Sequence, residues 1–422
     1  MKIHIDIDCF FVSAARIEDP SLNNKAVAIG GRSDTKIFSR KAKNQVVNFE
    51  NSGSFVPTFY KAYEKDTFRD ANGRIRGILT TSSYEARAYG VKTAMSIREA
   101  LQLCPQLIVK TSNMPLYQQL SHQLHDFLCL KIPLIEQASI DEFYADVSGW
   151  IEDKDIPQFI KNLQDEIQKE LNLPVSIGAA PTRYIAKLAT SSAKPFGCKT
   201  ITTKDLDTFI NPIKVENFAG IGKSMKNRLD SVHIKTLGEL KKRRGTIESW
   251  GPYAKELYKR VNAESDAPIK TKHTRKSIGI SRTFDSLYDR KELQRRVHIL
   301  ARHLNFAIMK LNVIPTLFHL TISYEMNQKS HRSISLAEIF TEKKFDTLCL
   351  SLFKDADIHR RLNVIRLSIN CSSFTKDSKK ELSLIGFEEE KKMHMLTCKV
   401  QKLREKYGID TLKFASELSN LK

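Results

Sequence analysis

The sequence predicts a multidomain protein of the α+β class, and three observations support this prediction. The chain has 422 residues, which is enough for about two to four domains. Strand-like and helix-like patterns alternate up to residue 202, whereas residues 203–265 form a run of short helical patterns separated by glycines. A polar, basic stretch at 266–276 is typical of a linker, and strands and helices return over residues 277–375.

The first strand has the clearest pattern. Residues 3–8 alternate isoleucine with a polar residue, which predicts a strand that has Asp6 and Asp8 on the same face. A helix-like stretch follows from Phe10, and residues 25–29 predict a second strand that ends at Gly30 and Gly31. Residues 32–77 show no clear period, so we interpret them as a long loop or insertion.

The remaining elements follow from periodicity and from helix start and stop signals. Strands are predicted at 78–81, 174–178, 318–324 and 363–370, and two strands between 134 and 147 turn near 139–141. Helices are predicted at 96–103, 114–130, 156–171, 182–193 and 388–406. The 182–193 helix ends because Pro195 disfavours helical geometry in the residue before it.

The composition indicates a polyanionic partner. Lys and Arg number 68 against 48 Asp and Glu, and the resulting net charge of +20 attracts polyanions such as nucleic acid. Ribosome-associated and membrane-surface proteins are also basic, so charge alone does not choose among them. No apolar run approaches the ~20 residues that a membrane helix needs, and we expect a cytoplasmic, nucleoid-associated protein. The seven scattered cysteines predict neither a disulfide framework nor a zinc site.

Acidic residues supply the first candidate site. Asp6 lies on the first strand, and Asp141 and Glu142 lie near the tip of the predicted hairpin. If the hairpin neighbours the first strand, these carboxylates converge and repel one another unless a divalent cation binds them. Oxygen ligands favour magnesium, and two such ions can hold the attacking and leaving oxygens of a phosphoryl transfer. Taken singly, an acidic residue in such a place is more often a capping or solvated residue than a metal ligand.

Basic and hydroxyl side chains form a second group. Tyr84 and Arg87 lie three residues apart at the start of a predicted helix, where phosphate binds readily. Arg183, Lys187 and Lys194 are spaced so that one helix face carries three cations. A metal-bound triphosphate needs such counter-charges, although a solvated basic face is the alternative interpretation.

Four ordered blocks resemble the signature motifs of Y-family DNA polymerases, most of all the bacterial polymerase IV and UmuC-like branch. They are DIDCFF at 6–11, SYEAR at 83–87, ASIDE at 138–142 and AKPFG at 193–197. The resemblance implies a right-hand polymerase with a palm, fingers, a helical thumb and a little finger. The implied boundaries are 1–10 and 113–202 for the palm, 11–112 for the fingers with the insertion at about 32–77, 203–265 for the thumb, 266–276 for the linker, 277–375 for the little finger and 376–422 for a C-terminal tail.

The resemblance also implies an activity and its residues. The protein would be a template-directed, error-prone translesion DNA polymerase that joins deoxynucleoside triphosphates to primer-template DNA and releases pyrophosphate. Two Mg²⁺ ions would be held by Asp6 and Asp141, with Glu142 on the catalytic ion and the Ile7 carbonyl on the other. The residues implied to contact the nucleotide are Tyr84, Arg87, Lys194, Lys187 and Phe11, the last as a steric gate against a ribose 2′-hydroxyl.

Two further classes remain as alternatives to a polymerase. A non-catalytic DNA-binding scaffold would use the basic surface without turnover, although all three expected acidic ligands are present. A metal-dependent nuclease would also use carboxylates, but hydrolysis needs no triphosphate pocket.

Two segments outside the catalytic blocks suggest macromolecular contacts. Gly220, Gly222 and Lys223 lie between short helical patterns, as in a helix-hairpin-helix that binds a DNA phosphate, whereas an ordinary helix cap is the alternative. Residues 381–387 (ELSLIGF) resemble the peptide by which bacterial polymerases bind a sliding clamp, although the leading Gln is missing. A packed strand or helix edge is an equal alternative for this peptide. We expect a monomer.

Overall fold

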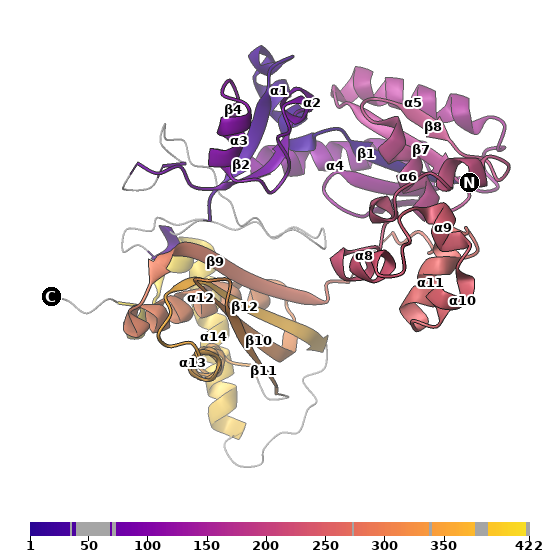
Figure 1. Cartoon of the computed structure of the whole chain (residues 1–422). Coiled ribbons are helices and arrows are strands. Elements are labelled where there is room, and N and C mark those ends of the chain that lie inside the picture. The colour runs from indigo at the N-terminus through magenta and orange to yellow at the C-terminus, as the bar shows by residue number, and fades with distance from the viewer. Residues whose placement is uncertain are drawn as a thin grey trace. The chain divides into compact units, whose positions relative to one another are not determined.

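The computed structural model describes residues 1–33, 36–38, 68–69, 73–271, 274–336, 340–375 and 387–418. These residues fall into two compact units (Figure 1). One unit contains the described residues of Met1–Gly31 and Lys61–His273, and the other contains those of Arg32–Tyr60 and Thr274–Lys422.

The first unit is built on a five-stranded sheet with the order β5-β6-β1-β7-β8. The central strand, β1 (Lys2–Ile7), pairs antiparallel with β6 (Glu142–Asp146) and with β7 (Val175–Ala180). Strands β5 (Ile135–Gln137) and β8 (Cys198–Thr200) form the edges. The predicted alternation is confirmed, because the isoleucines of β1 pack against α4 (Met114–Lys131) and α5 (Ile156–Leu171), while α6 (Arg183–Ala193) covers the polar face.

Gly178 allows α6 to lie directly on β7. A Cβ atom added at this residue would lie 2.3 Å from the backbone oxygen of Ala186 and 2.3 Å from the backbone nitrogen of Thr190. Two backbone atoms of one helix cannot move away without displacing the helix, so no larger residue fits. The glycine therefore sets the depth at which α6 presents its side chains to β1.

Gly178→Ala should destabilise the first unit by about 1–3 kcal/mol, the usual cost of forcing extra atoms into a packed interior. Chemical denaturation of the purified variant measures this as a lower midpoint. Gly245→Ala is the matched control, because nothing lies within 4 Å of a Cβ atom built at that position. An unchanged midpoint for Gly178→Ala would show that α6 is not held at this distance.

A three-stranded sheet lies next to α1 (Phe10–Glu18) in the same unit, with the order β3-β2-β4. Its strands are β3 (Ile78–Ser82), β2 (Val27–Gly31) and β4 (Ile108–Thr111), and α2 (Tyr84–Ala88) and α3 (Ile97–Leu103) follow β3. Strand β2 ends at Gly31, as predicted, although both glycines are part of the strand. A Cβ at Gly30 would meet Ile97 and Val109 at 2.9 Å, so this glycine permits close packing of the sheet.

Short helices complete the first unit, as the sequence predicts. They are α7 (Leu206–Ile210), η3 (Val215–Asn217), α8 (Lys223–Asp230), α9 (Leu237–Lys241), α10 (Arg244–Glu248) and α11 (Pro252–Val261). Their apolar side chains form one core with those of α6. The chain beyond α11 is held at two points, because Asp266 accepts a hydrogen bond from the Arg183 amide at 3.0 Å and the Lys270 amide donates to Glu136 at 2.7 Å.

The second unit has a four-stranded antiparallel sheet with the order β11-β10-β12-β9. The strands are β9 (Ser277–Leu287), β10 (Ile314–Tyr324), β11 (Lys329–Ser335) and β12 (Val364–Thr375). Helices α12 (Arg290–Lys310) and α13 (Glu342–Ala356) pack on one face of this sheet. The other face carries short polar and basic side chains, including those of His319, His331 and Arg366.

The C-terminal segment packs on α12 through buried charges. It comprises α14 (Phe387–Tyr407), η4 (Ile409–Thr411) and η5 (Ala415–Glu417). The buried Arg302 of α12 donates hydrogen bonds to Glu417 at 2.8 and 2.9 Å and to Asp410 at 3.0 Å. The range of α14 confirms the predicted helix at 388–406. The clamp-like peptide lies outside the described residues, apart from the backbone of Phe387.

Part of the predicted insertion packs on the second unit. In the short turn η2 (Lys36–Phe38), Ile37 and Phe38 are buried in the core that contains α12. The Phe38 ring makes an edge contact with Phe284, and Arg296 lies over both rings. Most other residues of the insertion lie outside the described part of the chain.

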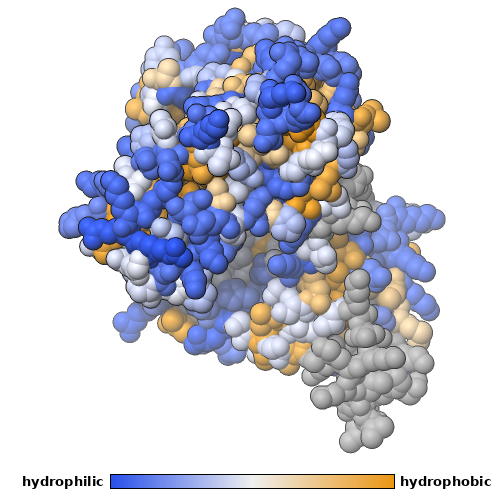
Figure 2. Space-filling model, turned by 90° about the vertical axis from the view of Figure 1, so that its right-hand side faces the viewer, coloured by the Kyte–Doolittle hydropathy of each residue, from blue (hydrophilic) through white to orange (hydrophobic). Residues whose placement is uncertain are grey.

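The surface is mainly hydrophilic on the face shown in Figure 2, with smaller hydrophobic areas between the hydrophilic ones. Across the described ranges, none of the helices combines the length and the apolar character needed to cross a membrane.

Candidate active site

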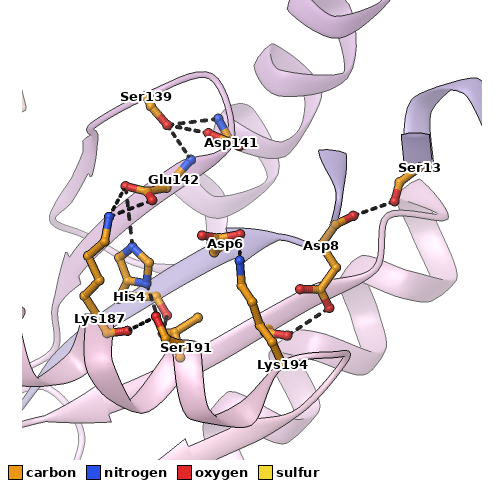
Figure 3. Close-up of polar contacts among 12 residues, drawn as sticks. His4, Asp6, Asp8, Ser13, Ser139, Asp141, Glu142, Lys187, Ser191 and Lys194 are labelled. Carbon is orange, nitrogen blue, oxygen red and sulfur yellow. Dashed lines mark hydrogen bonds and ion pairs between the residues drawn. The ribbon is translucent and has the colours of Figure 1, made fainter. Parts of the chain in front are cut away.

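Two of the predicted carboxylates face each other across a strand pair. Asp6 of β1 is the direct cross-strand partner of Glu142 at the start of β6. One ligand atom from each of His4, Asp6 and Glu142 lies within 4.8 Å of the others. Asp141 immediately precedes Glu142, and its charge adds to burial in raising the pKa of Asp6. Figure 3 shows Glu142 turned toward Lys187 and His4, Asp6 turned toward Lys194, and Asp141 beside Ser139 at the hairpin tip.

The hairpin tip that carries Asp141 is held by two sets of hydrogen bonds. The Ser139 hydroxyl donates to the Asp141 carboxylate at 2.5 Å and accepts from the Glu142 amide at 3.1 Å. The Ile7 amide donates to the Asp141 carbonyl at 3.0 Å, which fixes the tip to the end of β1. These contacts and the β1–β6 pairing place all three carboxylates at one end of the sheet.

Two lysines form ion pairs with two of the three carboxylates. The Lys187 ammonium lies 2.6 and 2.7 Å from the two oxygens of Glu142, and that of Lys194 donates to Asp6 (Figure 3). Lys194 does not continue the face of α6 as predicted, because it precedes Pro195 and adopts an extended conformation just past the helix. Arg183 is also not a free counter-charge, since it forms a bidentate pair with Glu136 at 2.9 Å.

The electrostatics of this cluster favour a bound cation. Burial raises the pKa of Asp6 to about 6, even though Lys194 lowers it, and burial also raises the pKa of Asp141. Burial alone would raise the pKa of Glu142, but His4 and Lys187 outweigh it and lower that pKa to about 2. Three carboxyl groups therefore share a partly buried site, where burial disfavours the charged forms of Asp6 and Asp141 and a nearby cation would favour them.

The donor set fits divalent metal ions. Three carboxylates offer the hard oxygen ligands that Mg²⁺ prefers. The Nε2 atom of His4 is buried, has no hydrogen-bond partner and lies 3.9 Å from a Glu142 oxygen. Carboxylate oxygens and a nitrogen atom without a hydrogen-bond partner can both act as ligands, so this site is suited to a cation.

Asp8 holds Tyr84 near the carboxylates. One oxygen of Asp8 accepts a hydrogen bond from the Tyr84 phenol at 3.1 Å, and the other accepts from the Ser176 hydroxyl at 2.9 Å and from the Phe196 amide at 2.6 Å. Burial and the charge of Asp8 raise the pKa of Tyr84 well above its usual value, so the phenol stays protonated. Arg87 lies over the Tyr84 ring at 5.0 Å, which confirms that both share one face of α2.

Phe11 lies on the first turn of α1, immediately after this cluster. Its ring stacks on that of Tyr117 from α4, with centroids 4.3 Å apart and planes inclined by 19°. Phe11 is only partly buried, whereas the neighbouring Phe10 is in the core. The α4 contact fixes the orientation of a ring that keeps one part exposed.

The predicted helix-hairpin-helix lies away from the carboxylates, in the helical part of the first unit. Gly220 adopts a φ of 103°, which favours glycine, and its carbonyl accepts a hydrogen bond from Tyr253 at 2.5 Å. Gly222 is the N-cap of α8, and Lys223 is its first residue. The amides at the start of α8 are thus available to an anion.

Sequence reasoning missed three contributors to this site. His4 could have been found, because it precedes Asp6 by two residues on the same strand face. The link between Asp8 and Tyr84 joins residues 76 positions apart, and Tyr117 lies 106 positions after Phe11, so no local pattern indicated either contact.

Comparisons with known proteins agree with the resemblance noted above. A family model described as the impB/mucB/samB family matches residues 5–191, and the model of its C-terminal domain matches residues 275–384. DNA polymerase IV of Bacillus anthracis is 29% identical over 425 residues, covering 99% of this chain and 93% of that protein. DNA polymerase IV of Pseudomonas paraeruginosa is 30% identical over 292 residues, covering 67% of this chain and 70% of that protein.

Solved structures support the same fold. A Y-family DNA polymerase chimera of Dbh and Dpo4 superimposes with a TM-score of 0.72 at 22% identity, covering 89% of this chain and 99% of the chimera. An insertion ternary complex of Dbh DNA polymerase gives a TM-score of 0.54 at 22% identity, with the same coverage of both chains.

Proposed function

This chain belongs to the Y family of DNA polymerases, in the bacterial polymerase IV branch, and from that premise we propose that it performs two-metal nucleotidyl transfer at Asp6, Asp141 and Glu142. The observation that carries the proposal is the cross-strand pairing of Asp6 with Glu142 beside Asp141. As a DNA-directed DNA polymerase, it joins a nucleotide to a primer end. The following assignments propose which residues bind the metal ions, the triphosphate and the DNA in this reaction.

The carboxylates would hold the metal ions, and the cations around them would hold the nucleotide. Asp6 and Asp141 would contact both ions, Glu142 the catalytic ion, and the Ile7 carbonyl the other. When bound, a pair of Mg²⁺ ions supplies positive charge to the attacking and leaving oxygens. The protein itself positions these ligands through the β1–β6 pairing and the Ser139 hydrogen bonds.

Tyr84, Arg87 and the two lysines would hold the triphosphate. The Arg87 guanidinium can donate hydrogen bonds to phosphate oxygens, and the Tyr84 phenol can do so once its hydrogen turns away from Asp8. Lys194 and Lys187 lie at the carboxylates and have long side chains that can reach an adjacent phosphate. Such fixed donors stabilise the charge that moves onto the leaving pyrophosphate.

Two surfaces would hold primer-template DNA without reading its sequence. The loop at Gly220 and Gly222, with Lys223, would contact a backbone phosphate, as sequence-independent binding requires. The open face of the β11-β10-β12-β9 sheet carries Lys329 and Arg366 among small polar residues, which suits a phosphate backbone. We assign the first surface to the thumb and the second to the little finger, with the five-stranded sheet as the palm and the three-stranded sheet in the fingers.

We further propose that the enzyme copies damaged templates with low fidelity, as its relation to polymerase IV suggests. Primer extension on a template with one abasic site tests this. The wild-type enzyme should insert a nucleotide opposite the site and extend beyond it with purified components and Mg²⁺. An enzyme that extends an undamaged template but stops completely at the abasic site would contradict the translesion assignment.

The remaining partners are inferred from the resemblance alone. We propose that residues 381–387 bind a sliding clamp and that the polymerase acts as a monomer at the nucleoid. The alternative function, a non-catalytic DNA-binding scaffold, is disfavoured by the juxtaposition of Asp6 and Glu142 with two lysines.

A further inference from the structure

We propose that Lys187 and Lys194 are internal counter-ions that compete with metal for the carboxylates, so that metal ions bind tightly only when a nucleotide draws the lysines away. This inference rests on the proposed function, and it concerns the order and coupling of ligand binding. It predicts that metal and nucleotide bind cooperatively, so that each raises the affinity of the protein for the other.

The geometry places one ammonium on each of two carboxylates. Lys187 contacts both oxygens of Glu142 at 2.6 and 2.7 Å, so an ammonium group already neutralises the charge that this carboxylate would offer to a metal ion. Lys194 donates to the Asp6 oxygen Oδ1. Asp141 differs, because its recorded partner is the neutral Ser139 hydroxyl, and among the described residues no ion pair is recorded for it.

The two lysines can also leave these positions. The Lys187 and Lys194 side chains are 32% and 26% exposed, whereas the side chains of their partners Glu142 and Asp6 are 24% and 12% exposed. Each lysine joins the site through a flexible stem with a strongly hydrated ammonium, so its position can change without moving α6. The carboxylates, by contrast, are fixed by strand pairing and the hairpin tip.

Charge balance then couples the two ligands. With the lysines in place, three carboxylates are opposed by two ammonium groups, and the site holds little net charge. Metal ions that enter alone leave the two ammonium groups without another anionic partner. The ammonium groups then stay close to the metal ions, and the repulsion between these like charges is unfavourable. A triphosphate supplies new oxygens for both lysines, so its arrival frees the carboxylates for metal. By linkage, metal must tighten nucleotide binding by the same factor.

Manganese binding to the DNA-free protein tests this coupling. Titration calorimetry with Mn²⁺ alone should show weak binding to the wild type, tightened about 5-fold or more by a non-hydrolysable α,β-imido deoxynucleotide. The manganese that the analogue binds by itself is subtracted. Lys187→Met and Lys194→Met should each bind Mn²⁺ about 5-fold or more tightly without nucleotide, and the analogue should then add less.

Two further variants locate the effect. Lys131→Met is the matched control, because Lys131 pairs with Glu166 at 2.7 Å away from the site, and it should bind Mn²⁺ like the wild type. Asp141→Asn should weaken Mn²⁺ binding in every background, which shows that the titration reports on this site. Circular dichroism shows whether each variant is folded. If a variant does not fold, the coupling between Mn²⁺ and the nucleotide analogue can still be measured in the wild-type protein.

The proposal is overturned if both lysine variants bind Mn²⁺ no more tightly than the wild type, or if the wild type shows no coupling between Mn²⁺ and the analogue. Failure of the proposed function would appear differently, as absence of primer extension by a wild-type protein that still binds manganese.

Discussion

Asp141→Ala/Glu142→Ala should abolish template-dependent primer extension in Mg²⁺, with a loss of about 10³-fold or more. The double change removes Glu142, the cross-strand partner of Asp6, and the adjacent Asp141, whose charge acts on Asp6. Without them the site cannot hold the cations that stabilise the attacking and leaving oxygens, and each ~1.4 kcal/mol of lost stabilisation costs tenfold in rate. Single-turnover extension of a labelled primer measures the effect.

A second adjacent Asp-Glu pair in the same unit provides a matched control. Asp165 and Glu166 lie on α5, where they form exposed ion pairs with Lys161 and Lys131. Asp165→Ala/Glu166→Ala makes the same chemical change and should leave extension near the wild-type rate, because exposed ion pairs contribute little. Extension that persists in the Asp141/Glu142 variant would show that these carboxylates are not catalytic.

Phe11→Ala should allow ribonucleotides into the site, increasing their use relative to deoxynucleotides by about 5- to 150-fold. The estimate follows from the ~1–3 kcal/mol that it costs to force additional atoms against a packed group. Phe11 can exert this effect because stacking on Tyr117 at 4.3 Å prevents its ring from yielding to a 2′-hydroxyl. The ratio of single-nucleotide insertion efficiencies for each nucleotide type gives the selectivity.

Phe11→Tyr is the appropriate control for this prediction. It keeps the aromatic ring and its stacking partner, so discrimination against ribonucleotides should stay close to that of the wild type. If Phe11→Ala discriminates as strongly as the wild type does, Phe11 is a packing residue of α1 and not the steric gate.

Local sequence pattern predicted most of the elements. The alternation of residues 3–8 gave β1 and its buried isoleucine face, and apolar periodicity placed α5 at residues 156–171, the range that the structure shows. Local pattern was insufficient where tertiary contacts decide the structure. Gly30 is part of β2 because it pairs with Leu79 of β3 and Thr111 of β4, contacts that no local pattern contains.

The site was predictable in its residue types but not in its contacts. Ordered motifs indicated the carboxylates, Tyr84 and Arg87, because each motif is contiguous in sequence. The pairing of Asp6 with Glu142 spans 136 positions, and the lysine contacts to both carboxylates span 45 and 188 positions. Such long-range contacts follow from how β6 and α6 pack on β1, which single-sequence periodicity does not specify.

The most direct test of the central claim is an anomalous-scattering experiment on crystals of the protein with primer-template DNA, Mn²⁺ and a non-hydrolysable deoxynucleotide. We predict two manganese peaks between the nucleotide phosphates and the carboxylates of Asp6, Asp141 and Glu142. A bound nucleotide with no manganese peak in contact with Asp6 and Asp141 would contradict the two-metal assignment.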